Sequence, residues 1–159
     1  MSETAVSKAF TLIELIFVLV IIGLLAAVAI PKFTHLSDNA KISSELSTAA
    51  SVQAAIEACH GEWIVNEGSF TCGKNIDSGN LNSDGYPDID TLGSQNAPFE
   101  NLLKNGTNIG WVRDDDNRFY GPASQNGKIR NPDIAGKPDG NDYWEYNATT
   151  GTFSLIDVE

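Results

Sequence analysis

Glu14 is the only charged residue in an otherwise apolar run, "FTLIELIFVLVIIGLLAAVAI", from Phe10 to Ile30. A carboxylate at the depth of a membrane costs about 2.5–3.5 kcal/mol by insertion scales, so such groups persist mainly where they have a partner or a function. The chemistry that Glu14 offers is charge pairing in a medium of low dielectric constant. Glu14 therefore requires a cation that the run itself does not supply.

Cys59 and Cys72 are the two cysteines of the chain. In an oxidising compartment, an even pair at this spacing most simply forms one disulfide, which stabilises a short loop by roughly 3 kcal/mol. His60 adjoins Cys59, but two cysteines and one histidine make a poor tetrahedral metal site. We therefore predict a Cys59–Cys72 disulfide.

Catalytic residues do not occur in a recognisable arrangement. The sequence contains no phosphate-binding glycine loop, no HExxH motif and no Gly-x-Ser-x-Gly motif. The two histidines, His35 and His60, both fall on a predicted helix rather than beside an acid and a nucleophile. The net charge of −11 argues against nonspecific nucleic-acid binding, which needs basic residues to displace counterions. We predict no enzymatic activity and no specific nucleic-acid site.

The Phe10–Ile30 run would span about 31 Å as a helix, enough to cross the core of a bilayer. One interpretation is a removable secretory signal, because Lys8 precedes the run and "AVA" at 27–29 has the small-x-small pattern of a cleavage site. Against it, the run exceeds the usual length of about 7–15 apolar residues and contains an acid. The other interpretation is a plain membrane anchor, with Glu14 near one interface.

The sequence after Pro31 predicts that the helix continues. No glycine or proline occurs before Gly61, which we predict ends the helix, and Pro31 should kink it. A helix of about 50 residues, or about 75 Å, is too long for a signal peptide and unusual for a plain anchor. Apolar residues recur at intervals of three, four or seven within two successive groups, one from Phe33 to Ala40 and one from Ile42 to Cys59, which places them along one helical stripe. These residues are Phe33, Leu36, Ala40, Ile42, Leu46, Ala49, Ile56 and Cys59.

The segment "KAFTLIELIFVLVIIGLLAAVAIPKF" resembles the N-terminus of the type IV pilins and of the related pseudopilins of type II secretion. The matching features are a short leader with Lys8, the small residue Ala9, and then the residues Phe10–Glu14. Gly23 and Pro31 also fall where that family has helix-softening positions. The resemblance covers about the first third of the chain. The family usually has glycine before the cleavage site, so Ala9 is a departure, although its small side chain should still fit.

This resemblance implies that a prepilin peptidase cleaves between Ala9 and Phe10 on the cytoplasmic face of the inner membrane and methylates the new amine of Phe10. It also implies that the precursor lies in the lipid bilayer with a periplasmic head. An assembly platform and its ATPase would then build copies of the chain into an extracellular helical filament. The Phe10 amine, of a neighbouring subunit or of the same chain, would be the cation that Glu14 needs. A helix docked in the wrong register would leave Glu14 unsatisfied.

We therefore expect an α+β, type IV pilin-like fold, in which one long N-terminal helix with a membrane half and an amphipathic half packs on a small antiparallel β-sheet. The expected divisions are a leader peptide at 1–9, a transmembrane and filament-core helix at 10–30, an amphipathic helix at 31–60 and a β-rich globular head at 61–159. The expected function is a structural subunit of a pilus-like surface filament. The alternatives are a type II secretion pseudopilin and, in a different class, a calcium-binding surface protein with a plain anchor or a cleaved signal.

Several segments of the head predict local structure. "EWIV" and "SFTC" predict a hairpin around "NEG", and "APFENLLKNG" predicts a short helix with Pro98 in its first turn. "NIGWVRDDDNRFYGP" predicts two strands around an Asp-rich turn, and "DYWEYNATTGTFSLID" predicts an antiparallel hairpin. Together they predict a three- or four-stranded antiparallel sheet. The aromatic residues expected in the core or on the sheet face, rather than in a ligand platform, are Trp63, Trp111, Tyr120, Trp144 and Tyr146.

The loop "GNLNSDGYPDID" resembles the front of the calcium loop D-x-[DN]-x-[DN]-G and, more closely, the calcium loop of FG-GAP repeats. In such loops, alternate side-chain oxygens, a backbone carbonyl and a further acid surround Ca²⁺. Two features depart from the pattern, because the first position is an asparagine and Thr91 stands where an EF-hand has its bidentate glutamate. Asp77 or Asp90 could add a ligand, and the alternative is a polar turn without an ion. The implied ligands are Asn80, Asn82, Asp84, Tyr86 (through its carbonyl) and Asp88.

Two other acidic clusters, "RDDDN" (114–116) and "NPDIAGKPDGND" (Asp133, Asp139 and Asp142), are expected to form solvated turns. The major pseudopilins bind calcium in a loop late in the sheet, so the resemblance makes the second cluster an alternative calcium site. The glycosylation sequons that begin at Asn105 and Asn147 are attributed to chance in a chain rich in Asn and Thr.

Overall fold

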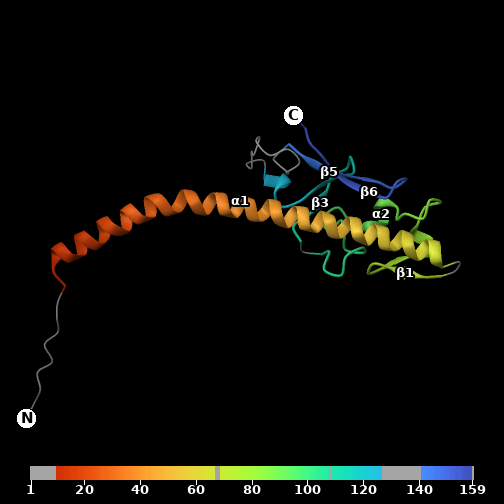
Figure 1. Ribbon diagram of the computed structural model, residues 1–159, viewed down its shortest axis with the longest axis horizontal. Helices are drawn as coiled ribbons and strands as arrows, with labels where there is room; N and C mark the ends of the chain where they lie inside the picture. The colour runs from red at the N-terminus through yellow and green to blue at the C-terminus, as the bar shows by residue number, and fades with distance from the viewer. Residues whose placement is uncertain (1–9, 67–68, 108, 127–140, 159) are drawn as a thin grey trace, which may run out of the picture. The chain divides into compact units, whose positions relative to one another are not determined.

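The computed structural model describes residues 10–66, 69–107, 109–126 and 141–158. The chain divides into two compact units, Met1–Ser37 and Asp38–Glu159, and helix α1 (Leu12–Val65) contributes to both. Within the described residues, α1 is the helix that is long and apolar enough to cross a membrane. The predicted long N-terminal helix is therefore confirmed (Figure 1).

The first unit is the apolar start of α1. Thr11 precedes the helix, and its side-chain oxygen accepts the backbone N–H of Glu14 at 3.3 Å, which satisfies one of the free donors of the first turn. The helix continues through Pro31 without interruption. The kink that Pro31 should introduce stays a prediction.

The second unit contains a four-stranded antiparallel sheet in the order β3-β4-β5-β6, as predicted. Its strands are β3 (Val112–Arg113), β4 (Arg118–Tyr120), β5 (Tyr143–Asn147) and β6 (Thr152–Ile156). The β5–β6 hairpin is the most regular part, with five residue pairs in register from Tyr143 opposite Ile156 to Asn147 opposite Thr152. Figure 1 shows the sheet beside the C-terminal half of α1.

The core of the head forms where α1 meets the sheet. Side chains alternate along β5, so Trp144 and Tyr146 are buried while Glu145 is exposed. The stacked rings of Trp144 and Phe153, with centroids 5.3 Å apart, lie in the same apolar cluster as the buried face of α1. In this cluster the face consists of Ala49, Val52, Ile56 and Cys59, whereas Ile42, earlier in the helix, is buried in a smaller cluster with Ala123.

The predicted apolar stripe is buried over only part of its length. Phe33 and Leu36 are 68% and 63% exposed, whereas Ile42 is buried, so the head covers the stripe only from Ile42 onward. Trp111, Trp144 and Tyr146 lie in the core as expected, and Tyr120 is half-buried. Trp63 instead lies on α1 and is 40% exposed.

The prediction that Gly61 ends the helix is wrong, because α1 continues to Val65. The ring of Trp63 packs along that of His60, with centroids 5.6 Å apart, and this contact holds the additional turn. Asn66 then ends the helix, since its side-chain amide donates to the carbonyl of Glu62 at 3.0 Å. A glycine permits a helix to stop, but it does not require one to stop when the next turn has contacts of its own.

Because "EWIV" belongs to α1, the hairpin predicted between "EWIV" and "SFTC" is also wrong. The strand that contains Cys72 is β1 (Thr71–Cys72). It pairs antiparallel with β2 (Ile76–Asp77), which follows it in the sequence, and not with the preceding segment. The short helix η1 (Ser78–Asn80) follows, and a second short helix, η2 (Ser124–Asn126), follows β4.

The short helix predicted at "APFENLLKNG" is absent from the described structure of residues 97–106, which are turns. One bond of the α-helical type forms, from Leu103 N to Phe99 O, but the bonds on both sides close tighter turns. Phe99 and Leu102 are buried in the core, so tertiary contacts rather than helix propensity decide this segment. The helix nearby is α2 (Ile89–Leu92), which begins earlier in the sequence.

Candidate functional site

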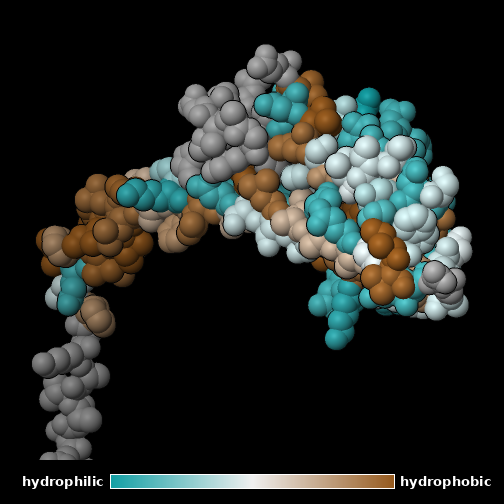
Figure 2. All heavy atoms as spheres, turned by 45° about the vertical axis from the view of Figure 1, so that its right-hand side comes forward, coloured by the Kyte–Doolittle hydropathy of each residue, from teal (hydrophilic) through white to brown (hydrophobic). Residues whose placement is uncertain are grey.

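The most unusual surface of the chain is the apolar first part of α1. Its large side chains are exposed, from Leu12 at 76% to Ile30 at 64%. Figure 2 shows these apolar residues, in brown, gathered over the N-terminal part of the helix. Contiguous apolar surface of this extent marks a membrane or protein contact, because water solvates it poorly.

Glu14 lies in the first turn of α1 and is exposed within this apolar surface. Its backbone N–H is bonded to Thr11, but no described residue gives its carboxylate a hydrogen bond or an ion pair. The helix dipole favours an acid at this position by about 0.3–1 kcal/mol, which is a local reason for Glu14 to be there. That gain is smaller than the cost of an unpaired carboxylate in an apolar medium.

The predicted processing site is only partly visible. Phe10 is 82% exposed and precedes the helix, so its backbone is accessible. Ala9 lies outside the described residues, and so does the rest of the predicted leader. Cleavage between Ala9 and Phe10 therefore stays a prediction.

A second glutamate of α1, Glu45, is fully buried in the head. One carboxylate oxygen accepts the backbone N–H groups of Ala123 and Ser124, at 2.7 and 3.1 Å. The other accepts the Ser124 hydroxyl at 2.6 Å and the indole N–H of Trp144 at 2.8 Å. Gly121 allows this approach, since a Cβ there would lie 2.3 Å from the carboxyl carbon. Four donors make burial of the carboxylate tolerable and tie α1 to η2 and β5.

Sequence reasoning missed the role of Glu45, although a signal was present. Glu45 falls three residues after Ile42 and four before Ala49, which is the spacing of the predicted apolar stripe. An acid in the middle of a buried stripe needs partners within the fold. Those partners are 78 to 99 positions away in sequence, so spacing alone could not identify them.

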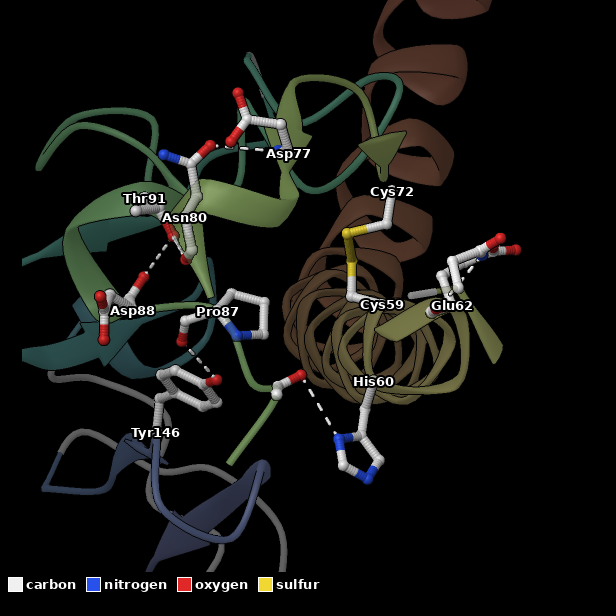
Figure 3. The surroundings of a disulfide bond; sticks show 12 residues. Cys59, His60, Glu62, Cys72, Asp77, Asn80, Pro87, Asp88, Thr91 and Tyr146 are labelled. Atoms are coloured by element: carbon white, nitrogen blue, oxygen red, sulfur yellow. Dashed lines mark hydrogen bonds between the residues drawn. A yellow bond between two sulfur atoms is a disulfide. The ribbon is translucent and has the colours of Figure 1, made fainter. Parts of the chain in front are cut away.

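The predicted disulfide between Cys59 and Cys72 is confirmed. It joins α1 to β1, with Cα atoms 5.1 Å apart, and both cysteines are buried (Figure 3). The structure thus fastens the loop after α1 to the helix. His60, beside Cys59, stacks on Tyr86 with ring centroids 4.2 Å apart, and its Nδ1 lies 3.3 Å from the carbonyl of Gly85.

The residues predicted to bind calcium lie in the loop between η1 and α2. The side-chain oxygen of Asn82 accepts the backbone N–H groups of Asp84 and Tyr86, both at 3.0 Å, and the Tyr86 carbonyl accepts the N–H of Asn82 at 2.8 Å. The side-chain oxygen of Asn80 accepts the N–H of Asp77 at 3.1 Å (Figure 3). These bonds hold the loop in shape by themselves.

The carboxylates of Asp84 and Asp88 are exposed beside this loop. Among the described residues, no three histidine, cysteine, aspartate or glutamate side chains gather in a group that could hold a metal ion. Any site here would depend on amide and carbonyl oxygens that already accept hydrogen bonds. Calcium binding stays a prediction.

The other two acidic clusters, at 114–116 and at Asp133, Asp139 and Asp142, differ in what the structure shows of their side chains. Asp114 accepts the backbone N–H of Arg118 at 2.8 Å and the hydroxyl of Tyr120 at 3.1 Å, so it organises the β3–β4 turn. Asp133 and Asp139 lie outside the described residues. Asp142 is 1% exposed and accepts the backbone N–H of Val158, so the prediction that it lies in a solvated turn is wrong.

Residues 5–30 match the family model described as the prokaryotic N-terminal methylation motif. Over 49 residues, the chain is 51% identical to the type IV narrow pilus major component PilA5 of Thermus thermophilus. These 49 residues are 31% of this chain and 42% of that protein. It is 42% identical over 55 residues to the type IV major fimbrial protein FimA of Dichelobacter nodosus, covering 35% of each. It is 40% identical over 65 residues to a fimbrial protein of Neisseria meningitidis, covering 39% of this chain and 38% of that protein.

These matches span less than half the length of the curated relatives. No solved structure matches the chain. The relatives are named as pilus and fimbrial proteins, and the family model matches the N-terminal residues 5–30.

Proposed function

We propose that this chain, whose residues 5–30 match the prokaryotic N-terminal methylation motif, is the structural subunit of a type IV pilus-like surface filament. The observation that carries the proposal is the exposed apolar surface of α1 from Leu12 to Ile30, interrupted only by Glu14. A surface of this kind needs lipid before assembly and other subunits afterwards. The relatives that share this segment are named as major pilus or fimbrial proteins.

The route to the filament begins with a precursor held in the inner membrane by α1, with its N-terminus in the cytoplasm and its head in the periplasm. A prepilin peptidase removes residues 1–9 and methylates the amine of Phe10. An inner-membrane assembly platform and its ATPase then move the subunit from the bilayer into a filament of identical copies. The matched methylation motif at residues 5–30 supports this route.

In this proposal, the charge on Glu14 acts in filament assembly rather than in insertion of the helix into the membrane. In a filament, the apolar surfaces of many helices would pack into an interior of low dielectric constant, where an unpaired charge is costly. Cleavage before Phe10 creates a cationic amine four residues from Glu14. If that amine belongs to a neighbouring subunit, Glu14 sets the register, because any other alignment leaves both charges unpaired.

The test is the intact mass and N-terminal sequence of the protein recovered from cells and from sheared surface fibres. We expect a chain that starts at an N-methylated Phe10 and is present in the fibre fraction. A chain that starts at Met1 and stays in the membrane would indicate a plain anchor, and one that starts at Ile30 a cleaved signal. Either result would contradict the proposal.

The same experiment separates the pilin from the pseudopilin alternative when it is combined with a deletion strain. A pilin deletion removes the surface fibres and leaves the secretion of folded exoproteins unchanged. A processed Phe10 start with no fibres and with lost secretion would identify a pseudopilin instead.

A further inference from the structure

A cavity of about 470 Å³ opens at the sheet where β4 begins. β4 pairs with β5 only through Arg118 and Phe119, opposite Glu145 and Trp144. Within the described residues, the end of β5 at Tyr146 therefore has no strand beside it on that side. Asn117, which precedes β4, and Tyr146 both line the cavity, and its volume falls in the range of about 300–1,000 Å³ that is typical of small-molecule sites.

The cation in the wall of the cavity is Arg118, whose side chain is partly exposed. The guanidinium of Arg118 lies 4.9 Å from the centre of the Tyr143 ring and 3.7 Å from the carboxylate of Asp116. A planar guanidinium carries five N–H donors, so Arg118 has N–H groups to offer a ligand on this side of the cavity.

Two other polar side chains that line the cavity have no partner. In the described part of the chain, neither the carboxylate of Glu145 nor the side-chain amide of Asn117 makes a hydrogen bond or an ion pair. Asn117 also has φ of 60°, a left-handed conformation that non-glycine residues adopt infrequently. Asparagine adopts this conformation more readily than most residues, so the β3–β4 turn accommodates it while its amide lines the cavity.

Tyr146 also lines the cavity, but its hydroxyl is not free for a ligand. It donates to the carbonyl of Pro87 at 2.7 Å, and Figure 3 shows this bond. Its ring, together with Ile89, therefore supplies apolar surface rather than a polar contact. The ligand chemistry is set by Arg118, Asn117 and the two carboxylates.

These groups combine donors and acceptors with a small net negative charge. An anionic ligand would face Asp116, Glu145 and a protein of net charge −11. A simple cation would face Arg118. A neutral polyhydroxylated ring matches the set, because each hydroxyl both donates and accepts and because its C–H faces can lie on Tyr146 and Ile89. We propose that this cavity binds a neutral saccharide.

The site belongs to the head alone, so this inference does not depend on filament formation. The full chain is solubilised in a detergent without a sugar headgroup, such as an alkyl-dimethylamine oxide. Glucose, galactose, N-acetylglucosamine and lactose are titrated and observed by saturation-transfer NMR. Glucuronic acid and glucosamine serve as charged comparisons of similar shape. We expect at least one neutral sugar to bind, and the two charged sugars to bind more weakly.

Two variants test the assignment to this cavity. Glu145→Ala removes the unpaired carboxylate, and Asn117→Gly removes the amide while it retains a residue that accepts a positive φ freely. Each should weaken sugar binding by roughly 3–10-fold, the effect of losing a hydrogen bond to a ligand. Ser154→Ala is the matched control, since Ser154 is exposed directly opposite Glu145 on β6 but lies outside the cavity. It should leave binding unchanged.

The proposal is overturned if no neutral sugar shows saturation transfer up to about 50 mM, which is well above a millimolar dissociation constant. It is also overturned if glucuronic acid binds as well as the neutral sugars, or if both cavity variants bind like the unchanged chain. Circular dichroism checks the fold of each variant. If Glu145→Ala does not fold, Asn117→Gly decides the outcome.

Discussion

Two glutamates on the same helix have opposite surroundings. Glu45, in the head, has no exposed surface and accepts four hydrogen bonds from residues of its own chain. Glu14, in the first unit, is exposed in an apolar surface, and no described residue pairs with its carboxylate. A glutamate side chain is therefore hydrogen-bonded within the fold at position 45, whereas at position 14 it has no partner among the described residues.

The two glutamates show that the two parts of the molecule differ in where the partners for their charged and apolar side chains come from. The head buries an apolar core and provides four hydrogen bonds to the buried Glu45 from residues of the same chain. The first part of α1 does neither, so its stable environment must come from lipid or from other chains. Each prediction below tests this comparison.

The largest expected effect is on assembly. Glu14→Ala should abolish most surface fibres, because the amine of Phe10 would stay unpaired in a low-dielectric interface at a cost of about 3–5 kcal/mol. Insertion into the membrane should be unchanged. The measurements are the protein in the shear fraction and in the membrane fraction.

Two variants separate the charge of Glu14 from its place in the first turn. Glu14→Gln keeps a side chain that suits this position of a helix start but lacks the charge, so it should fail like Glu14→Ala. Thr11→Ala removes the observed cap at a cost of about 1 kcal/mol and keeps the charge, so fibres should form. Normal fibres from Glu14→Gln would contradict the charge-pairing role.

Glu45→Ala should destabilise the head by about 3–4 kcal/mol, because it leaves the Trp144 indole and the N–H groups of Ala123 and Ser124 buried without an acceptor. Denaturant unfolding followed by tryptophan fluorescence measures this loss. Glu57→Ala, which changes an exposed glutamate of the same helix, should stay within about 0.5 kcal/mol. Equal effects of the two variants would show that the Glu45 contacts do not stabilise the head.

The joint substitution Cys59→Ala and Cys72→Ala should lower the free energy of unfolding by about 3 kcal/mol, the effect of opening a short closed loop. The measurement is thermal unfolding with and without a reducing agent. The reducing agent should destabilise the unchanged protein and have no effect on the variant. Free thiols in the unreduced protein would contradict the disulfide.

The stability of the head should fall at alkaline pH. Burial, and then the nearby Asp88 and Tyr86, raise the pKa of Tyr146 above its ordinary value. An unfolded tyrosine ionises near pH 10 while the folded one stays protonated, so stability is complete below about pH 10 and is lost as pH rises further.

Tyr146→Phe should therefore cost about 1 kcal/mol at neutral pH, for the lost bond to Pro87, and should make the alkaline decrease shallower. Burial also raises the pKa of Tyr120, so part of the decrease should remain in the variant. Denaturant unfolding at a series of pH values measures both effects. If the stability of Tyr146→Phe fell as steeply at alkaline pH as that of the unchanged protein, the fall would be due to groups other than Tyr146.

The smallest expected effect is that of calcium. Binding at the loop 80–88 would raise the midpoint of thermal unfolding as the calcium concentration increases. The rise should be modest, because hydrogen bonds within the loop already hold it. Joint substitution of Asp84→Asn and Asp88→Asn should remove the rise, and magnesium at the same concentration is the control. No rise at millimolar calcium would contradict the prediction.

The parts of the fold that sequence predicted are those in which local pattern and final structure agree. The β5–β6 hairpin combines alternating apolar residues with a turn at "NATTG", and its Gly151 adopts φ of 67°, which suits glycine. The long helix follows from the apolar run before Pro31 and from the periodic apolar residues between Pro31 and Gly61, where no glycine or proline occurs. The short helix near Phe99 was wrong because core contacts of Phe99 and Leu102 overrode local preference, and the helix end at Gly61 was wrong because the next turn has contacts of its own, those of Trp63 and Asn66.

The long helix α1, its apolar first part around a single acid, and the pairing of the two cysteines are all predictable without coordinates. Each of these is a property of neighbouring positions or of a count, and so it can be read along the chain. The folded chain is needed to show that Glu45 is satisfied by residues 78 to 99 positions away and that Arg118, Asn117 and Glu145 line one cavity. Those contacts depend on how the sheet packs against the helix, which is a sum of many weak long-range interactions that no local pattern encodes.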